Sequence, residues 1–240
     1  MKPFKYQGEE LDLFSLAVNW KQYWAALVSP YINGRVLEVG AGEGNNSRLV
    51  QSYCQGRFSG WTCLEPDSIL MDRLKQTFTG EQSSTTVDFV QGTITDLSAD
   101  PGYDTVLYID VLEHIADDVT EIATAAELLN ENGYMIVLSP AHNFLYTEFD
   151  RGIGHFRRYT VNSLIDLTPE SLKPVRSRYV DSAGMIVSLA NRLLLRQSLP
   201  TTTQIKIWDN IFIPVSRVLD VLSFGKLGKS VIVVWRKLHV

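Results

Sequence analysis

The sequence predicts an α/β fold with a mostly parallel sheet, and three observations lead to this prediction. Short apolar runs alternate with segments of helical periodicity five times between residues 36 and 138, a pattern typical of parallel strands joined by right-handed crossovers. A turn rich in glycine follows the first apolar run. The length of 240 residues, with 45% hydrophobic and 20% charged residues, fits one full-sized globular domain with embellishments.

The elements can be placed along the chain from their periodicity and their breaking residues. Apolar residues recur at helical spacing from Leu11 to Leu27, and Pro30 and the Asn33-Gly34 pair end that helix. The expected strands are 36–39, 61–64, 87–90, 103–109, 134–138, 174–181 and 230–238. The expected later helices are 45–55, 68–78 (with Ser68 as its cap), 117–129 (ended by Asn132-Gly133), 160–172, 185–195 and 205–222.

Composition and charge exclude several classes of function. The formal net charge of −5 argues against a partner bound through nucleic-acid phosphates. The only cysteines are Cys54 and Cys63, without a C-x-x-C pair, which is typical of a reduced chain without structural zinc. The N-terminus lacks the apolar core of a signal peptide, and no run of about 18 apolar residues spans a membrane. We therefore expect a cytoplasmic protein that does not act on nucleic acid.

The chain is organised around Val36–Gly44, which reads VLEVGAGEG. Glycines at alternate positions leave the turn without side chains, so its backbone can approach a ligand closely. The N–H groups of the following helix face the same spot. The third glycine comes four residues after the first, whereas the dinucleotide fingerprint G-x-G-x-x-G requires five. Further along, Glu65 ends the second strand, about 20–25 residues after the turn, where an acid can accept hydrogen bonds from ribose hydroxyls.

With Glu38 two residues before the first glycine, this pattern resembles motif I of the class I S-adenosylmethionine (SAM) dependent methyltransferases. The resemblance implies a Rossmann-like seven-stranded sheet in the order 3-2-1-4-5-7-6, with strand seven antiparallel and helices on both faces. It also implies SAM as cofactor and S-adenosylhomocysteine (SAH) as product. The residues expected to contact SAM are Glu38, Gly40, Ala41, Gly42, Gly44, Asn45, Glu65, Pro66, Asp67, Thr93, Ile94, Asp110 and Val111. In the family, the turn at Thr93 and Ile94 flanks the adenine through a backbone N–H and an apolar side chain.

Two later segments are expected to serve the acceptor. Asp110–Ile115 contains the sequence LEH, which resembles many class I enzymes acting on small molecules, and no Pro-Pro-aromatic motif of nucleic-acid amino methylation occurs there. The segment 139–160 concentrates aromatic, acidic and basic residues around two glycines, and its GH-aromatic-RRYT sequence resembles bacterial methyltransferases associated with cell-surface polysaccharides or secondary metabolites. The expected substrate-binding residues are Trp20, Tyr146, Asp150, Arg157, Arg158 and Tyr159.

Deprotonation of an acceptor hydroxyl calls for a base that titrates near neutral pH, which is a property of histidine. The candidates are His142, His155 and His114. A second interpretation places Asp110, Glu113 and His114 on one side of a helix, where they could hold a divalent cation. A similar acid-x-x-Glu-His arrangement is linked to metal in ubiquinone-biosynthesis O-methyltransferases. We expect no metal. The arginines of the loop suit an anionic acceptor, or pair with Asp150 or Glu148.

The chain is expected to form one domain, 1–240, with an N-terminal helical lid at 1–33 and a helical insertion at 182–229. The leading hypothesis is methyl transfer from SAM to a small polar acceptor, mainly at oxygen. The alternatives are transfer to nitrogen or carbon, a SAM-binding sensor or subunit without turnover, and an NAD-dependent oxidoreductase. The last is disfavoured because this sequence has no Tyr-x-x-x-Lys pair after the fifth strand. The insertion is expected to be a packed cap or a homodimer surface, with membrane contact as a less favoured interpretation.

Overall fold

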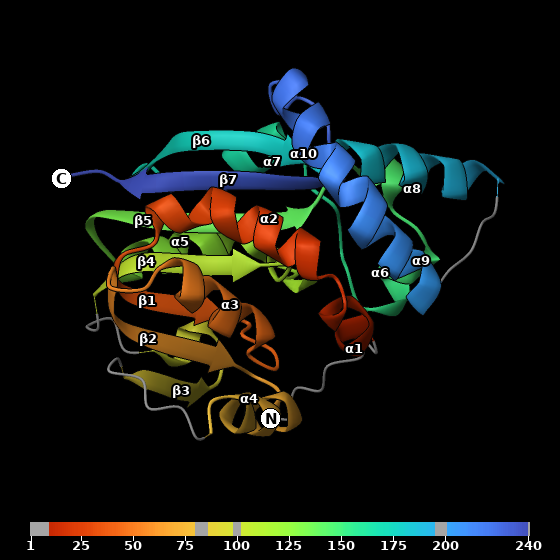
Figure 1. Cartoon of the computed structure of the whole chain (residues 1–240). Helices are drawn as coiled ribbons and strands as arrows, with labels where there is room; N and C mark the ends of the chain where they lie inside the picture. Colours follow the sequence, from red (N-terminus) through yellow and green to blue (C-terminus); the bar gives the residue numbers. More distant parts are fainter. Residues whose placement is uncertain (1–9, 80–85, 98–101, 195–200, 240) are drawn as a thin grey trace.

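The computed structural model describes residues 10–79, 86–97, 102–194 and 201–239, and its centre is one twisted sheet (Figure 1). The strands are β1 Gly34–Val39, β2 Phe58–Glu65, β3 Val87–Gln91, β4 Tyr103–Ile109, β5 Leu129–Pro140, β6 Leu172–Val180 and β7 Ser230–Lys237. Their order is β3-β2-β1-β4-β5-β7-β6. The pairs among β1 to β5 are parallel, and β7 runs antiparallel between β5 and β6. The predicted fold and strand order are confirmed.

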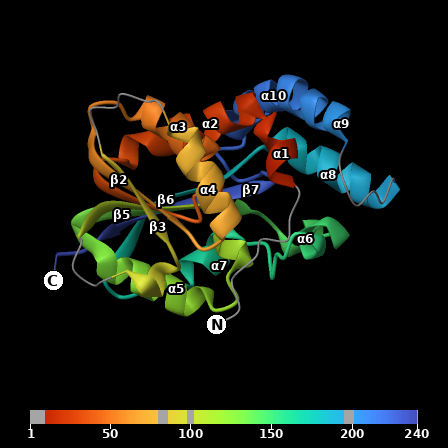
Figure 2. The same ribbon diagram turned by 90° about the horizontal axis from the view of Figure 1, so that it is seen from below.

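The helices cover both faces of this sheet (Figure 2). They are α1 Glu10–Ser15, α2 Val18–Val28, α3 Asn45–Tyr53, α4 Ser68–Thr77, α5 Asp118–Leu128, α6 Glu148–Gly152, α7 Val161–Ile165, α8 Ser182–Leu194, α9 Thr202–Ile207 and α10 Ile213–Leu222. Strand side chains alternate between two cores. On β1, Val36 packs with α2, α3 and α4, while the adjacent Leu37 packs with α5 and α7. The sheet is thus buried on both faces, and ligands can reach it only at its ends.

Four local predictions differ from the structure. The first helix is divided into α1 and α2 at Leu16 and Ala17. The helix predicted over 160–172 ends at Ile165, ahead of Pro169, which cannot continue it. Strand β5 begins at Leu129, so Asn132-Gly133 lies within the strand and does not end a helix. The cap of α4 is Asp67, whose Oδ1 accepts hydrogen bonds from the N–H groups of Ile69 and Leu70 at 2.8 and 3.1 Å.

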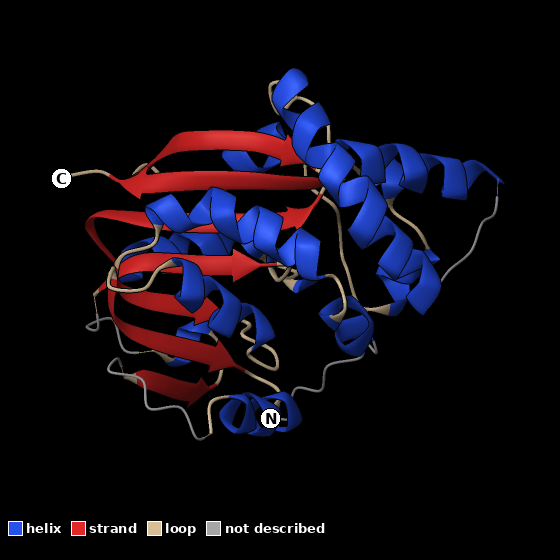
Figure 3. Ribbon diagram, viewed as in Figure 1, coloured by secondary structure: helices blue, strands red, loops and turns tan. Residues whose placement is uncertain are grey.

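The insertion between β6 and β7 consists of α8 and a continuous rod formed by α9, the π-helical residues Trp208–Phe212, and α10 (Figure 3). Residues 195–200 of the expected insertion and 1–9 of the expected lid lie outside the described residues. Two buried aspartates fix the rod. Asp209 accepts hydrogen bonds from the N–H groups of Asn19 and Trp20 at 3.0 and 2.8 Å, and thereby caps α2 from 190 residues away.

The second aspartate, Asp220, joins the rod to α2 and to the start of α8. It accepts hydrogen bonds from the Tyr23 hydroxyl at 2.8 Å and from the N–H groups of Asp181 and Ser182 at 2.8 and 2.9 Å. The insertion therefore has fixed polar anchors on its inner side. None of the helices in the described ranges is both long enough and apolar enough to cross a membrane.

Candidate active site

A cavity of about 900 Å³ opens at the carboxyl ends of the central strands. Its wall is formed by the glycine turn after β1, the ends of β2 and β4, the loop after β5, and the inner sides of α2, α8 and α9. This volume is at the upper end of the range for small-molecule sites, so the cavity has room for two reactants together. We call the part beside the glycine turn the donor end, and the part beside the loop 140–158 the acceptor end.

The glycine turn brings backbone to the cavity at the donor end. Gly40 has a φ of +65°, and a Cβ there would lie 2.6 Å from Val111 Cγ2, so no larger residue fits. Gly42 has a φ of +57°, but a Cβ there would meet no atom within 4 Å. A side chain at Gly42 would therefore project into space that a ligand can use. Ala41, Asn45 and Val111 also line the cavity, whereas Gly44 caps α3 and packs on Leu74 outside it.

Glu65 lies at the end of β2 and borders the donor end. Its Oε2 accepts a hydrogen bond from Gly42 N–H at 2.8 Å, and its Oε1 accepts one from Asp67 N–H at 2.9 Å. A carboxylate has about four acceptor positions, so roughly two remain for hydroxyl groups in the cavity. Burial raises the pKa of Glu65, and the two N–H donors partly oppose that shift. Pro66 lines the cavity beside it, and Asp67 does not.

Glu38, the acid of the glycine motif, lies behind the turn. It is 3% exposed, is not part of the cavity wall, and accepts a hydrogen bond from Trp61 Nε1 at 2.9 Å. Burial raises the pKa of Glu38 to about 7, against the opposing effect of hydrogen bonds from Ser47 and Trp61. Its contacts join the turn to β2 and to α3, so its role in the structure is to position the glycines.

The other predicted donor residues lie along the same wall. Ile94 is 2% exposed and offers an apolar surface, while the N–H of Thr93 donates to Asp96 Oδ2 at 2.8 Å and is therefore already engaged. Asp110 follows β4 with a φ of +55°. Asp110 is exposed to the space of the cavity. Because the cavity lies deep in the protein, desolvation, followed by the charge of Glu113, raises the pKa of Asp110 to about 7.

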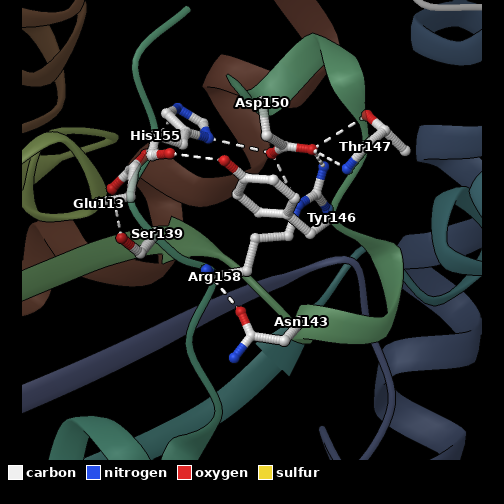
Figure 4. A network of polar contacts seen from close by, with 8 residues as sticks. All are labelled: Glu113, Ser139, Asn143, Tyr146, Thr147, Asp150, His155 and Arg158. Carbon is white, nitrogen blue, oxygen red and sulfur yellow. Dashed lines mark hydrogen bonds and ion pairs between the residues drawn. The ribbon is translucent and has the colours of Figure 1, made fainter. Parts of the chain in front are cut away.

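At the acceptor end, His155 is held between two carboxyl groups (Figure 4). Its Nδ1 lies 3.0 Å from Asp150 Oδ1, and its Nε2 lies 3.8 Å from Glu113 Oε1. The Tyr146 hydroxyl donates to the backbone oxygen of His155 at 2.7 Å. Asp150 and His155 both line the cavity, which also contains the glycine turn. The imidazole is therefore fixed on two sides and reaches the space shared with the donor end.

Asp150 is an ionised carboxylate in this arrangement. Arg158 donates to it twice, from Nε at 2.8 Å and from Nη2 at 3.0 Å, and the N–H of Thr147 donates at 2.8 Å. Burial opposes ionisation, but the hydrogen bonds from His155 and Arg158 outweigh it and hold the pKa of Asp150 well below its usual range. A group that stays charged in this way can orient His155 and stabilise its protonated form.

Glu113, His114 and His155 form the cluster among the described residues that could hold a metal ion, with ligand atoms within 4.8 Å of one another. Glu113 is fully buried; its Oε2 accepts from Ser139 Oγ at 2.5 Å, and its Oε1 has no hydrogen-bond partner. Burial, and then His155, lower the pKa of His114 to about 4, so it would be a neutral ligand. The second interpretation required Asp110, Glu113 and His114 to lie on one side of a helix. Leu112–His114 forms a 3-10 turn instead, and Asp110 is not part of this cluster.

One predicted catalytic residue, His142, and several predicted substrate-binding residues lie outside the cavity wall. His142 stacks between Tyr179 and Phe144, at ring distances of 4.6 and 5.0 Å. Tyr159 donates to Asp118 Oδ2 at 2.7 Å, and Arg157 pairs with the same carboxylate. Tyr146 also lies outside the wall, whereas Trp20, His114, Asp150, His155 and Arg158 are part of it. The arginines of the loop are paired with acids, Arg151 with Glu148 and Arg158 with Asp150, as one of the sequence interpretations allowed.

The structure adds two lysines to the cavity that the site prediction omitted. Lys229, just before β7, lies 3.7 Å from Asp181 and 4.0 Å from the centre of the Trp208 ring, and burial lowers its pKa. Lys21 follows Trp20 on α2, and burial lowers its pKa as well. Lys21 lies on the same helix as Trp20, which was predicted to bind substrate, so the sequence offered a signal that this helix borders the site. Lys229 is brought in by the insertion, and the sequence contains no comparable signal for it.

The strand order, with the antiparallel β7 between β5 and β6, is that of the class I methyltransferase fold. Residues 37–135, a little over 40% of the chain, match a family model described as a methyltransferase domain. This match, on this fold, supports SAM-dependent methyl transfer as the activity. The matched range holds the glycine turn, Glu65, Asp110 and Glu113, but ends before the loop with His155. No curated protein matches the chain.

Solved structures support the fold with low sequence identity. The [4+2]-cyclase SpnF has a TM-score of 0.63 at 16% identity, with 97% of this chain and 96% of that chain covered. Coclaurine N-methyltransferase bound to N-methylheliamine and SAH has a TM-score of 0.62 at 12% identity, with 98% and 76% covered. A chain from a complex of the Haloferax volcanii Trm112 methyltransferase activator with a candidate methyltransferase has a TM-score of 0.62 at 15% identity, with 96% and 92% covered. Because one of these is a cyclase, the fold alone does not select the acceptor.

Proposed function

We propose that this methyltransferase transfers the methyl group of SAM to the hydroxyl of a small polar acceptor, with His155 as the general base. The observation that carries the proposal is that His155, oriented by Asp150, lines the same cavity as the glycine turn and Glu65. A donor at one end and a fixed base at the other are the two requirements of O-methylation.

The donor end has the groups that a nucleoside with an amino-acid tail requires. Gly42 leaves space against the turn, the free acceptor positions of Glu65 suit ribose hydroxyls, and Ile94 suits one face of the adenine. Asp110 and the start of α3 remain for the charged methionine part. When bound, SAM supplies a methyl group that is already activated by its positively charged sulfur.

The chain's own part in the reaction is to position the acceptor and remove its proton. We assign the proton of the neutral imidazole to Nδ1, because Asp150 Oδ1 can accept a hydrogen bond from it at 3.0 Å. The lone pair then lies on Nε2, on the side of the ring away from Asp150. When an acceptor hydroxyl is methylated, Nε2 would take up its proton. Nδ1 would stay hydrogen-bonded to Asp150 and would hold the ring in place during the transfer.

Two other functions share the donor end but differ at the acceptor end. A SAM-binding subunit without turnover has no use for an imidazole fixed by a buried carboxylate. Transfer to an amine requires only a neutral nitrogen with its lone pair free. The arginines of the loop would bind a carboxylate on an amine or on an alcohol equally well, so they do not distinguish these two classes of acceptor. The support for oxygen is therefore His155 and its two carboxyl neighbours.

The experiment is methyl transfer from isotopically labelled SAM to a panel of paired acceptors. Each pair shares one carbon skeleton and differs only in carrying a hydroxyl or an amine, with and without a carboxylate. We expect label in the hydroxyl member. Exclusive labelling of amines would contradict O-methylation, and SAH binding without label transfer to any class would favour the non-catalytic subunit.

A further inference from the structure

The outer side of the rod formed by α9, Trp208–Phe212 and α10 carries an exposed apolar stripe. Its members recur at steps of three and four residues, so they lie on one face of the helix. They are Ile207, Ile211, Val215, Val218 and Leu222, exposed by 45, 56, 44, 60 and 68%. Phe224 and Leu227 extend the stripe past the end of α10, with 86 and 50% exposed. In Figure 1 this rod runs past the ends of β6 and β7 and lies beside α8.

The charges of the same segment are divided by sign. Within 201–229, the exposed charged residues are Lys206, Arg217 and Lys226, and all three are basic. The acids of this segment, Asp209 and Asp220, are 2 and 0% exposed, because they face inward and hold α2 and α8. The guanidinium of Arg217 is turned toward α2, where Nη2 donates to the backbone oxygen of Asn19 at 3.0 Å and the group lies 5.4 Å from the centre of the Tyr23 ring. The apolar stripe therefore has Lys206 and Lys226 as the basic residues near its two ends, although the chain as a whole has a net charge of −5.

Phe224 is an independent sign that this surface has a use. It follows the last turn of α10 with a φ of +54° and is 86% exposed. Glycine or asparagine normally occupies this left-handed position, because a larger side chain is disfavoured there. Phe224 gains no burial within the chain that would offset this conformational cost, so its ring is kept in solvent against the local preference.

We propose that this surface, Ile207 to Leu227, docks on an anionic lipid bilayer, with the rod lying in the interface. An amphipathic helix with an apolar face and flanking basic residues binds at the headgroup boundary without crossing it, and anionic lipids attract lysine and arginine there. A second copy of the chain is the less suitable occupant. An isologous contact through this face would gather the basic residues of both copies at one interface, where the segment offers no exposed acid to pair with them.

Membrane docking would also place the active site beside the lipid. The rod that carries the stripe on its outer side carries Ile205 and Trp208 on its inner side, where both line the cavity. This inference goes beyond the proposed hydroxyl methylation and does not depend on it, since the surface can bind lipid whatever the acceptor is.

The test is flotation of the full chain with vesicles of phosphatidylcholine alone and of phosphatidylcholine mixed with phosphatidylglycerol. We expect the protein to float with the anionic vesicles, and the bound fraction to fall as salt rises. The double variant Leu222→Ser/Phe224→Asn is expected to lose binding by roughly ten-fold, because it removes the apolar contribution of the stripe. Asparagine suits the left-handed position, so its thermal midpoint and its SAH affinity should stay at the wild-type level.

The control is Ile69→Ser/Val119→Ser, which removes two apolar residues that are 54 and 58% exposed on α4 and α5, away from the rod. It should bind vesicles as the wild type does. The proposal is overturned if the wild type binds anionic vesicles no better than neutral ones, or if both double variants lose binding equally. It is also overturned if light scattering shows a wild-type dimer that Leu222→Ser/Phe224→Asn converts to a monomer, because the stripe would then be an interface between copies.

Discussion

The two ends of the cavity are built in different ways. The donor end uses backbone groups and two acids, Glu65 and Asp110, from the ends of neighbouring strands, all within the range from Gly40 to Val111. The acceptor end gathers side chains from Trp20 to Lys229 and fixes them with ion pairs such as Arg158–Asp150. The difference teaches that this fold supplies the donor site from its strand order, whereas the acceptor site depends on long-range pairing that each sequence must create for itself.

The largest effect is expected from His155→Gln, which removes the proposed base at the acceptor end. Turnover should fall by roughly 10²–10⁴-fold, the usual contribution of a positioned base. Affinity for SAH should stay within about two-fold, since a change at the acceptor end leaves the groups of the donor end in place. The measurements are the initial rate with labelled SAM and calorimetric titration of SAH.

The matched control is His142→Gln, because His142 lies outside the cavity wall and stacks on Tyr179. Its turnover should remain near the wild-type rate. Loss of turnover in His142→Gln with full activity in His155→Gln would show that the acceptor end has been assigned to the wrong histidine.

The next effect concerns Glu38, which supports the donor end from behind. Its pKa is raised from 4.5 to about 7 in the folded chain, so the folded state holds a proton that the unfolded state has lost. The free energy of unfolding therefore falls as pH rises through this window, by about 3 kcal/mol at about 1.4 kcal/mol per pH unit.

Glu38→Gln keeps an oxygen to accept the hydrogen bond of Trp61 but cannot ionise. The variant should show a smaller fall in unfolding free energy between pH 5 and 8 and should exceed the wild type in stability above pH 7, as measured by urea titration across this pH range. Asp110 titrates in both proteins, so the difference between them isolates Glu38. Parallel pH profiles would mean that Glu38 is not the source of the slope.

A smaller effect is expected from Glu65→Ala at the donor end. SAH affinity should fall by about 1–3 kcal/mol, roughly 5–150-fold, because two ribose hydroxyls lose their acceptor. Asp67→Asn serves as control, since Asp67 caps α4 outside the cavity wall and its change should lower stability without weakening SAH binding. If both variants bind SAH equally well, Glu65 is not the ribose partner.

The smallest effect is expected from removal of metal. Chelation with EDTA should leave turnover unchanged, because the proposed mechanism uses His155 as a base and not as a ligand. Activity that is lost with EDTA and restored by Zn²⁺ or Mg²⁺ would instead assign Glu113, His114 and His155 to a metal site. The acceptor end would then be organised by a metal ion, and not by ion pairs as proposed above.

The sequence was sufficient for the sheet and for most of the donor wall, because both depend on local patterns. The glycines after β1 and the acid after β2 are spaced by the fold itself. It was not sufficient to test the second interpretation of Asp110, Glu113 and His114, because Asp110 has a positive φ and Leu112–His114 forms a 3-10 turn instead of the helix that this interpretation required. Nor could spacing reveal that Arg157 pairs with Asp118 while Arg158 pairs with Asp150, because neighbours in sequence point to different partners in space.

The most direct test of the account is calorimetric titration of SAH and of NAD into the wild-type chain. The account predicts that SAH binds with one site per chain and that NAD does not bind, because the glycine turn and Glu65 form a site for the nucleoside of SAM. Binding of NAD without binding of SAH would contradict the donor site and, with it, the proposed function.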